Sequence, residues 1–293
     1  NRTTDRFVWP SEHSCRIALA KALSGEHHNF MSDDVLGPRN PNRPAAKPVR
    51  LITESGQPVT GEQASGFTLA DSEILLNLYR KMVLARRFEA QVTALTRQGR
   101  LATYPSALGQ EACEISSVAA LRSTDWIFPT YRDTIALLTR GVSPIEILTF
   151  FRGDWHTGFD PYEYRVSPQS TPLATQALHA VGLATAAKLK GDDTVALNFA
   201  AVWQAPVVFI IQNNQYAISV PIAKQSHSRT LADRAIGYGM PGYYVDGNDA
   251  AAMYAVISDA VQRARSGGGP TMIEGLTYRI EAHTNSDDPT RYR

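Results

Sequence analysis

The sequence lacks the features that mark several large classes of protein. Its 293 residues include only two cysteines, Cys15 and Cys113, which excludes a disulfide scaffold and favours a reducing compartment. No apolar run is long enough for a transmembrane helix or a secretory signal, so we expect a soluble cytoplasmic protein without a membrane partner. The net charge is only +1 with both signs interspersed, which leaves no basic surface for nucleic acid.

A glycine-rich dinucleotide loop and internal repeats are also missing. No Gly-x-Gly-x-x-Gly follows a predicted strand, which disfavours a nucleotide-binding α/β protein, although detectable binding of NAD would favour it again. By contrast, 43% of the residues are hydrophobic, and the length suits one large α/β domain with extensions.

The chain is predicted to consist of two regions of different composition. Residues 1–66 are predicted to form an irregular arm or linker, because 37–48 contains four prolines and 54–66 is small and polar. One short strand is expected within this arm, at 50–53. Residues 67–293 are predicted to form the folded domain.

Helices are predicted at the start of the folded region. Apolar residues recur at helical spacing over 68–99, which predicts a long amphipathic helix, and a second helix is expected at about 109–121. Ser143 and Glu146 have the spacing of a helix cap and its third residue, with Pro144 between them at the first helical position.

From residue 173 onward, predicted helices and strands alternate. Helices are expected at 173–190, in the short stretch 230–239, and from an Asn248 cap to about Arg265. Strands are expected at 194–197, 207–211, 243–245 and 271–278. Such alternation is typical of a parallel sheet covered on both faces. The predicted fold is a doubly wound α/β domain with a helical N-terminal flank.

Three polar clusters should meet at the carboxyl ends of these strands, where ligands bind in such sheets: 129–133, 212–216 and 278–293. Each cluster alone has a simpler interpretation, since paired asparagines often form turns and a lone histidine is more often structural than catalytic. Together, amide oxygens, an arginine and a titratable histidine suggest a phosphate-bearing cofactor with a hard metal ion.

Six stretches in order resemble one known family: PTYRD (129–133), STPLATQALHAVG (170–182), QNNQYAIS (212–219), DGND (246–249), GPTMIEGLTYR (269–279) and HTNSDDPTRYR (283–293). Residues 67–293 are similar to the alpha subunit of thiamine-diphosphate-dependent 2-oxo acid dehydrogenases. This subunit belongs to the decarboxylating first component of the pyruvate and branched-chain complexes. The resemblance implies the thiamine-diphosphate-binding type of α/β fold.

The resemblance also implies a role for individual residues. Asn214 and the carbonyl of Tyr216 would bind Mg²⁺, while Tyr131 and Arg132 would contact the diphosphate, a bidentate task that suits arginine. Gln212, at the start of the same motif as Asn214, is counted among the cofactor-binding residues.

The remaining predicted site residues lie on two other motifs. Thr171 and Leu173 would line the aminopyrimidine pocket. Four residues match a potassium site: Ser170, Pro172, Thr175 and Gln176. His283 would face the thiazolium carbon as the catalytic residue and assist proton transfer, since imidazole titrates near neutral pH.

The implied reaction is oxidative decarboxylation of pyruvate with acyl transfer to lipoamide. The implied partners are a beta subunit, in an α2β2 heterotetramer, and a lipoyl-bearing acyltransferase component. A glutamate of the beta subunit would trigger formation of the cofactor ylide. Two alternatives stay open: a branched-chain (2-oxoisovalerate) dehydrogenase alpha subunit, and a catalytically defective paralogue or truncated product that retains only subunit association.

The sequence departs from the family pattern at one joint. The family carries Gly-Asp-Gly before its Asn-Asn pair, whereas the predicted strand 194–197 runs directly from Leu197 into Asn198. Asp192 precedes this strand and would lie at its amino end, roughly 13 Å from the edge of the sheet that holds Asn214. Ligands of Mg²⁺ lie at about 2.1 Å from the ion. A segment is therefore expected to be missing here, as are helices after Arg293, by omission or by real deletion. We expect weak binding of magnesium thiamine diphosphate.

Overall fold

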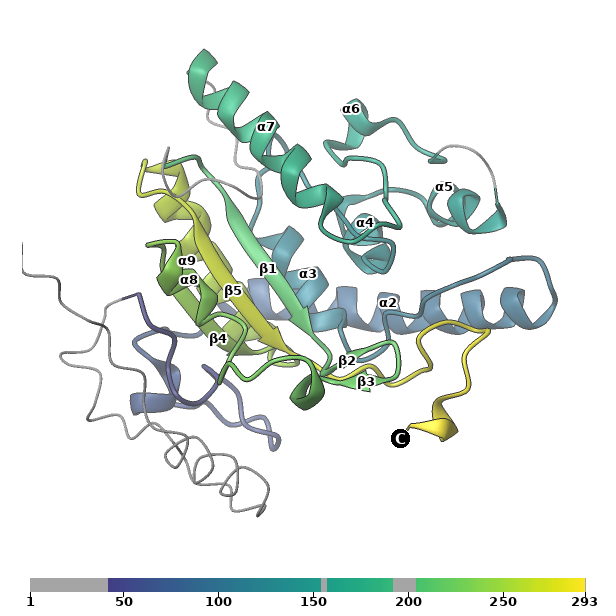
Figure 1. The fold of residues 1–293 in the computed structure, drawn as a ribbon, viewed down its shortest axis with the longest axis horizontal. Coiled ribbons are helices and arrows are strands. Elements are labelled where there is room, and N and C mark those ends of the chain that lie inside the picture. The colour runs from purple at the N-terminus through teal and green to yellow at the C-terminus, as the bar shows by residue number, and fades with distance from the viewer. Residues whose placement is uncertain (1–41, 154–156, 192–203, 293) are drawn as a thin grey trace, which may run out of the picture. The chain divides into compact units, whose positions relative to one another are not determined.

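The computed structural model describes residues 42–153, 157–191 and 204–292. Within them, three parallel strands form one sheet in the order β1 (Val208–Asn213), β5 (Thr271–Leu276) and β4 (Gly242–Asp246) (Figure 1). In the register, Val208 of β1 lies opposite Thr271 of β5. All three strands therefore end at one edge, and the predicted α/β fold with a parallel sheet is confirmed.

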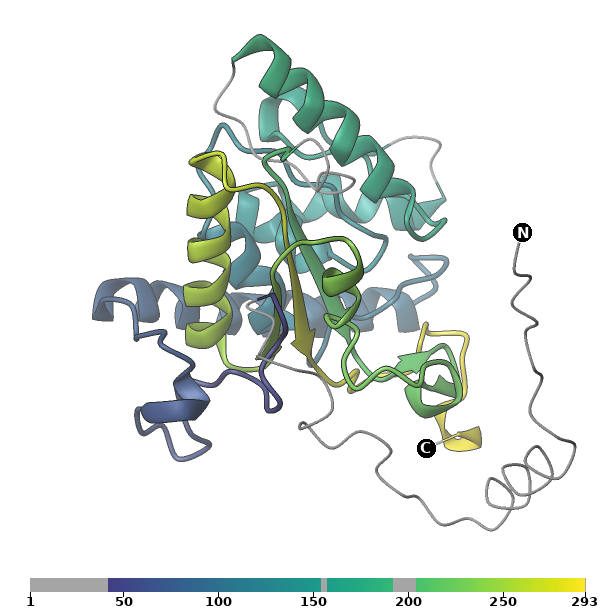
Figure 2. The same ribbon diagram turned by 60° about the vertical axis from the view of Figure 1, so that its left-hand side comes forward.

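Helices cover both faces of this sheet. Side chains of a strand point alternately to opposite faces, so Val208 and Ile273 pack with α9 (Ala250–Arg265). Phe209 points to the other face, in a cluster with α7 (Thr175–Lys190) and α8 (Arg234–Gly237). Figure 2 shows α9 and α8 on opposite sides of the strands.

A second core forms among the helices that precede the sheet. It is built from α2 (Ser72–Arg97), α3 (Glu111–Ala119), α4 (Thr134–Arg140) and α5 (Pro144–Thr149). α2 contributes buried apolar residues at helical spacing, namely Leu78, Ala85, Phe88 and Val92. The helices predicted at 68–99 and 109–121 are thus α2 and α3, each slightly shorter than expected.

Short elements complete the described part of the chain. A small antiparallel ladder joins β2 (Tyr216–Ala217) to β3 (Val220–Pro221) directly after β1. The remaining helical turns are α6 (Pro161–Tyr164), η2 (Gly61–Ala64), η3 (Phe150–Arg152), η4 (Ile222–Lys224) and η5 (Pro289–Arg291). No helix in the described ranges is both long enough and apolar enough to span a bilayer.

The two predicted helix caps have different outcomes. At α5 the cap is confirmed, because Glu146 N donates to Ser143 Oγ and Ser143 N donates to the Glu146 carboxylate. At α9 the predicted cap Asn248 is wrong. The cap is Asp249, whose Oδ1 accepts from Ala252 N at 3.0 Å. The anionic carboxylate is favoured at a helix N-terminus.

The segment before α2 is packed rather than loose where it is described. Val49 and Leu51 are buried in the same core as α9. Val49 N donates to Tyr244 O at 2.8 Å, which places residue 49 beside the free edge of β4. The strand predicted at 50–53 appears only as isolated bridges at Val49 and Ile52. The strand predicted at 194–197 lies outside the described residues.

Candidate functional site

The carboxyl edge of the sheet brings four chain segments together. β1 ends in the Gln212–Asn214 stretch, and β5 continues toward His283. The turn at 104–110 precedes α3, and the turn at 129–133 precedes α4. The three polar clusters predicted to converge here therefore do so.

Arg132 ties two of these segments together. It is only 7% exposed, and its Nη1 donates to Ser106 O at 2.7 Å. Its Nη2 donates to His283 O at 3.0 Å and lies 3.1 Å from His283 Nδ1. The Tyr131 ring lies under the guanidinium at 5.6 Å and meets the His283 ring edge-on at 6.2 Å. Tyr131, Arg132 and His283 thus form one cluster, as predicted.

A second buried arginine reaches the same histidine. Arg279 is 1% exposed, and its Nη1 lies 3.3 Å from His283 Nδ1. Its Nη2 donates to Ile218 O at 2.7 Å and to Tyr292 Oη at 3.1 Å. Two guanidinium groups therefore converge on one imidazole nitrogen.

This convergence determines the protonation of His283. Guanidinium groups donate and never accept, so Nδ1 must accept and the neutral ring carries its proton on Nε2. Burial, followed by the charges of Arg132 and Arg279, lowers the pKa of His283, and only Asp287 opposes them. Hydrogen bonds from Tyr292 and from His283 N in turn lower the pKa of Asp287. The cluster is cationic with a neutral imidazole, which suits an anionic ligand.

The two asparagines at the end of β1, Asn213 and Asn214, form a turn and also bind neighbouring segments. Asn213 Oδ1 accepts from Gln215 N at 2.9 Å, and Asn214 Oδ1 accepts from Tyr216 N at 3.2 Å. Gln215 has a left-handed φ of 69°. Asn214 Nδ2 donates to Gln110 Oε1 at 2.9 Å. The turn interpretation of the asparagine pair is therefore confirmed, and the cofactor-binding role of Asn214 stays a prediction.

The carboxylates at this edge already have hydrogen-bond partners. Asp133 accepts from Thr130 N and from Gln212 Nε2, both at 2.6 Å, and burial raises its pKa. Glu274 accepts from Asn213 Nδ2 at 2.6 Å and from Ala232 N at 2.9 Å.

A hard divalent cation needs several oxygen ligands, with carboxylates prominent among them. Of the described residues, no group of three or more His, Cys, Asp or Glu is placed to hold a metal ion. The two buried guanidinium groups at this edge suit the diphosphate of the predicted cofactor. The magnesium roles of Asn214 and Tyr216 stay predictions.

The loop with the other predicted site residues lies beside the 129–133 turn. Ser170 pairs with Thr130, and Gln169 Nε2 donates to Thr130 O at 3.3 Å. Ser170 O accepts from Gln176 Nε2 at 2.9 Å. Four residues lie at the start of α7 or just before it: Thr171, Pro172, Leu173 and Thr175. The potassium and aminopyrimidine roles of this loop stay predictions.

Five residues used above to describe the site were not assigned from the sequence: Ser106, Gln110, Asp133, Glu274 and Arg279. Arg279 and Glu274 lie inside the motif 269–279, and their nearly complete burial could have been suspected from their place in an apolar stretch. Ser106 acts through its backbone oxygen, so its residue type carries no signal.

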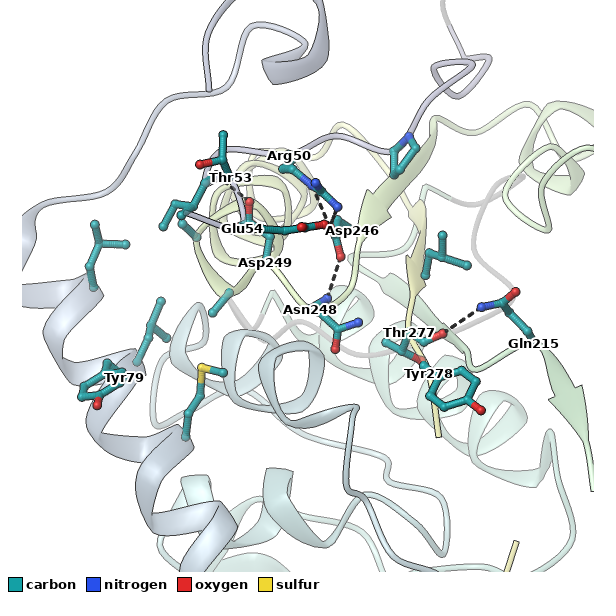
Figure 3. Close-up of a pocket in the computed structure, with 18 residues that line it drawn as sticks. Arg50, Thr53, Glu54, Tyr79, Gln215, Asp246, Asn248, Asp249, Thr277 and Tyr278 are labelled. Atoms are coloured by element: carbon teal, nitrogen blue, oxygen red, sulfur yellow. Dashed lines mark hydrogen bonds and ion pairs between the residues drawn. The ribbon is translucent and has the colours of Figure 1, made fainter. Parts of the chain in front are cut away.

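A separate cavity of about 600 Å³ opens at the carboxyl ends of β4 and β5 (Figure 3). Its wall includes Arg50, whose Nε and Nη2 bind Asp246 Oδ2 at 2.8 and 2.6 Å. Asp249, Tyr79 and Thr277 also line it. None of the predicted site residues lines this cavity, and it depends on the packed segment before α2.

The fold and the site together define a class of protein. It is an α/β protein with a parallel sheet whose carboxyl edge holds a buried, cationic cluster, and such a cluster suits an anionic ligand. Comparison with known proteins narrows this class. The model of the dehydrogenase E1 component family matches residues 79–197 and 194–293, most of the chain. The chain belongs to this family.

Individual relatives agree with this assignment. The chain is 45% identical over 264 residues to the 3-methyl-2-oxobutanoate dehydrogenase subunit alpha of Mycobacterium tuberculosis, covering 84% of the chain and 71% of the relative. It is 41% identical over 234 residues to the pyruvate dehydrogenase E1 component subunit alpha of Acholeplasma laidlawii, covering 74% and 68%. The corresponding Staphylococcus aureus subunit is 38% identical over 263 residues, covering 84% and 70%. The predicted membership of the 2-oxo acid dehydrogenase alpha subunits is confirmed.

Proposed function

We propose that this chain is the alpha subunit of an E1 component that decarboxylates a 2-oxo acid with thiamine diphosphate. The observation that carries the proposal is the Arg132–His283–Arg279 cluster, because two buried guanidinium groups neutralise a diphosphate. Thiamine diphosphate supplies the carbon nucleophile for such decarboxylations. The chain's own contribution is to bind the diphosphate, exclude water from it and hold a proton on His283 Nε2.

The wider architecture proposed with this function is the doubly wound sheet of the thiamine-diphosphate type. Helices on both faces of the parallel strands support it. Magnesium at Asn214 and potassium at Gln176 would belong to the complete site, and a cytoplasmic location would suit the low cysteine content.

Pyruvate is the proposed substrate, because two of the relatives described above carry pyruvate in their names. A specific observation favours a second candidate, 3-methyl-2-oxobutanoate. The M. tuberculosis relative that carries this substrate in its name is 45% identical to the chain.

The proposed partners are a beta subunit, in an α2β2 heterotetramer, and a lipoyl-bearing acyltransferase. An exposed apolar stripe on α2 supports a protein partner. Leu76, Tyr79 and Val83 follow each other at helical spacing and are 46%, 64% and 52% exposed. Exposed apolar residues grouped in this way mark interaction surfaces.

The test is co-expression with the beta subunit of the same organism. We expect a stable complex whose mass, from light scattering, corresponds to two copies of each chain. At high concentrations of thiamine diphosphate and magnesium, consumption of pyruvate is expected to exceed that of 3-methyl-2-oxobutanoate. The reverse preference would select the second candidate. Absence of any complex would refute the proposed function.

A further inference from the structure

One carboxylate lies inside the apolar face of α2. Glu89 is one helical turn before the buried Val92 and is itself 0% exposed, although glutamate is rarely fully buried without partners. Burial raises the pKa of its carboxyl, and hydrogen bonds from Tyr104 and Ser106 oppose this rise. Because a buried polar group costs free energy unless it is hydrogen-bonded, the partners of Glu89 indicate what it does.

Both oxygens of Glu89 bind the start of the turn at 104–110. Its Oε1 accepts from Tyr104 Oη at 2.7 Å and from Ala107 N at 3.1 Å. Its Oε2 accepts from Ser106 Oγ at 2.8 Å. All three donors belong to this turn, so one carboxylate fixes both its side chains and its backbone.

The same turn supports Arg132. Ser106 O accepts from Arg132 Nη1 at 2.7 Å, and Ser106 is also the residue whose hydroxyl Glu89 holds. Arg132 Nη2 contacts His283 O and Nδ1. Three of the five N–H groups of this guanidinium thus have partners among the described residues, and the other two are left for a ligand. The position of Ser106 O therefore decides where these two groups point.

The turn also holds the segment that carries His283. Tyr104 N donates to Asn285 Oδ1 at 2.9 Å, and Asn285 N donates to Tyr104 O at 3.3 Å. In the described part of the chain, the hydrogen bonds of the Glu89 carboxylate all go to the turn. Glu89 thus reaches Arg132 and His283 only through the turn that both of their segments contact.

We propose that Glu89 positions Arg132 for a diphosphate: it holds the turn at 104–110, so that Ser106 O sets the guanidinium toward the ligand. The inference rests on the proposed function, which supplies the diphosphate, and deepens it by adding a positioning residue on α2. Because Glu89 acts through Ser106 and Arg132, its loss should alter the binding of the diphosphate and the surroundings of His283.

Two substitutions at Glu89 test this proposal. Glu89→Leu removes the carboxylate and keeps an apolar side chain of similar size. Glu89→Gln is the matched conservative variant. Its amide oxygen can accept from Ala107 N while its amide N–H donates to Ser106 Oγ, since a hydroxyl can accept as well as donate.

Three further variants serve as controls. Asp125→Asn weakens a buried ion pair with Arg265 at 2.8 Å, in the last turn of α9, and so lowers stability away from the carboxyl edge. Arg132→Gln removes the guanidinium itself. Ser106→Ala removes only the hydroxyl that Glu89 holds, a change small enough to leave the fold intact.

Two quantities are measured for each variant. The affinity for thiamine diphosphate is measured by calorimetry on the complex with the beta subunit, and the pKa of His283 by NMR titration of the full alpha chain without ligand. Glu89→Leu should weaken binding by roughly tenfold or more, the value of one hydrogen bond from a charged group. It should also raise the pKa of His283, because burial and then the charge of Arg132 lower that pKa.

The other variants should differ from Glu89→Leu in a fixed order. Ser106→Ala should shift both quantities in the same direction but less, by about threefold in affinity. Glu89→Gln should keep both near their values in the unchanged chain. Asp125→Asn should change neither of them, although it lowers the free energy of unfolding.

Unchanged affinity and unchanged pKa in Glu89→Leu would overturn the inference. Equal shifts in Asp125→Asn would do the same, since any loss of stability would then loosen the cluster, as would a Glu89→Gln variant that behaves like Glu89→Leu. If Glu89→Leu does not fold, Ser106→Ala decides in its place. Failure of the proposed function looks different: Arg132→Gln would leave binding unchanged, or the unchanged chain would not bind, while the pKa of His283 would still respond to Glu89→Leu.

Discussion

The carboxyl end of β1 and the outer face of α7 differ in how their described side chains are packed. At the end of β1, side chains pair with other segments: Asn213 binds Glu274, Asn214 binds Gln110, and Gln212 Nε2 donates to Asp133. On α7, Ala180 and Ala184 pack with β1, whereas Leu178 and Leu189 on the opposite face of the helix are 61% and 83% exposed. The carboxyl edge of the sheet is held by contacts between segments that are far apart in the sequence.

Groups that bind an anion and groups that bind a cation usually occur together in a cofactor site of this kind. Buried guanidinium groups and a neutral imidazole can be arranged by β1, β5 and the turns before α3 and α4. Of the carboxylates at the described edge, Asp133 and Glu274 each accept one hydrogen bond on each oxygen. The carboxyl edge therefore combines two buried guanidinium groups with carboxylates that already make contacts within the protein.

The largest expected effect is on the free energy of unfolding, and it compares a buried side chain of β5 with an exposed side chain of α7. Ile273→Ala, at a fully buried position of β5, should lower the free energy of unfolding by about 3 kcal/mol, since it leaves a cavity. Leu189→Ala on α7 should change it by less than about 0.5 kcal/mol, because that side chain is 83% exposed. Urea denaturation followed by circular dichroism measures both. A large loss for Leu189→Ala would mean that another surface covers α7.

The next effect concerns the carboxylate that holds the asparagine turn. Glu274→Ala removes the acceptor of Asn213 Nδ2 and of the buried Ala232 N. We expect the free energy of unfolding to fall by about 2 kcal/mol, the usual cost of leaving a buried donor unpaired. Glu274→Gln is the matched control and should lose about half as much, because one amide oxygen still accepts. Equal losses would contradict this account of Glu274.

Much of this arrangement was predictable from local patterns. The apolar spacing of α2 and the capping box at Ser143 depend on neighbours in the sequence, and both are confirmed. The meeting of Arg132, Asn214 and His283 at one edge follows from the topology of a parallel sheet. Helices and their caps depend on local sequence, and the edge at which the strands end depends on the topology of the sheet. Both can therefore be predicted from a single sequence.

The contacts that could not be predicted depend on partners far along the chain. Asn248 and Asp249 are both good caps, and Asp249 Oδ2 also accepts from Leu51 N and Ile52 N at 2.7 and 2.8 Å. That distant segment selects the carboxylate as the cap. The pairing of Arg279 with Ile218 and Tyr292 and the cavity beside Arg50 likewise require segments to pack before they exist.

The smallest expected effect is on the pKa of His283. It directly tests the cluster that His283 forms with Arg132 and Arg279. Arg279→Gln removes one of two positive charges beside Nδ1, so the pKa of His283 should rise toward its ordinary value in an NMR titration of the ring. Arg279→Lys is the control and should leave the pKa low. With a lowered pKa in the folded state, the unfolded chain binds this proton first, so stability falls as pH decreases through about 6.5. That fall should be smaller in Arg279→Gln than in Arg279→Lys. An unchanged pKa in Arg279→Gln would mean that burial and Arg132 alone keep the imidazole neutral.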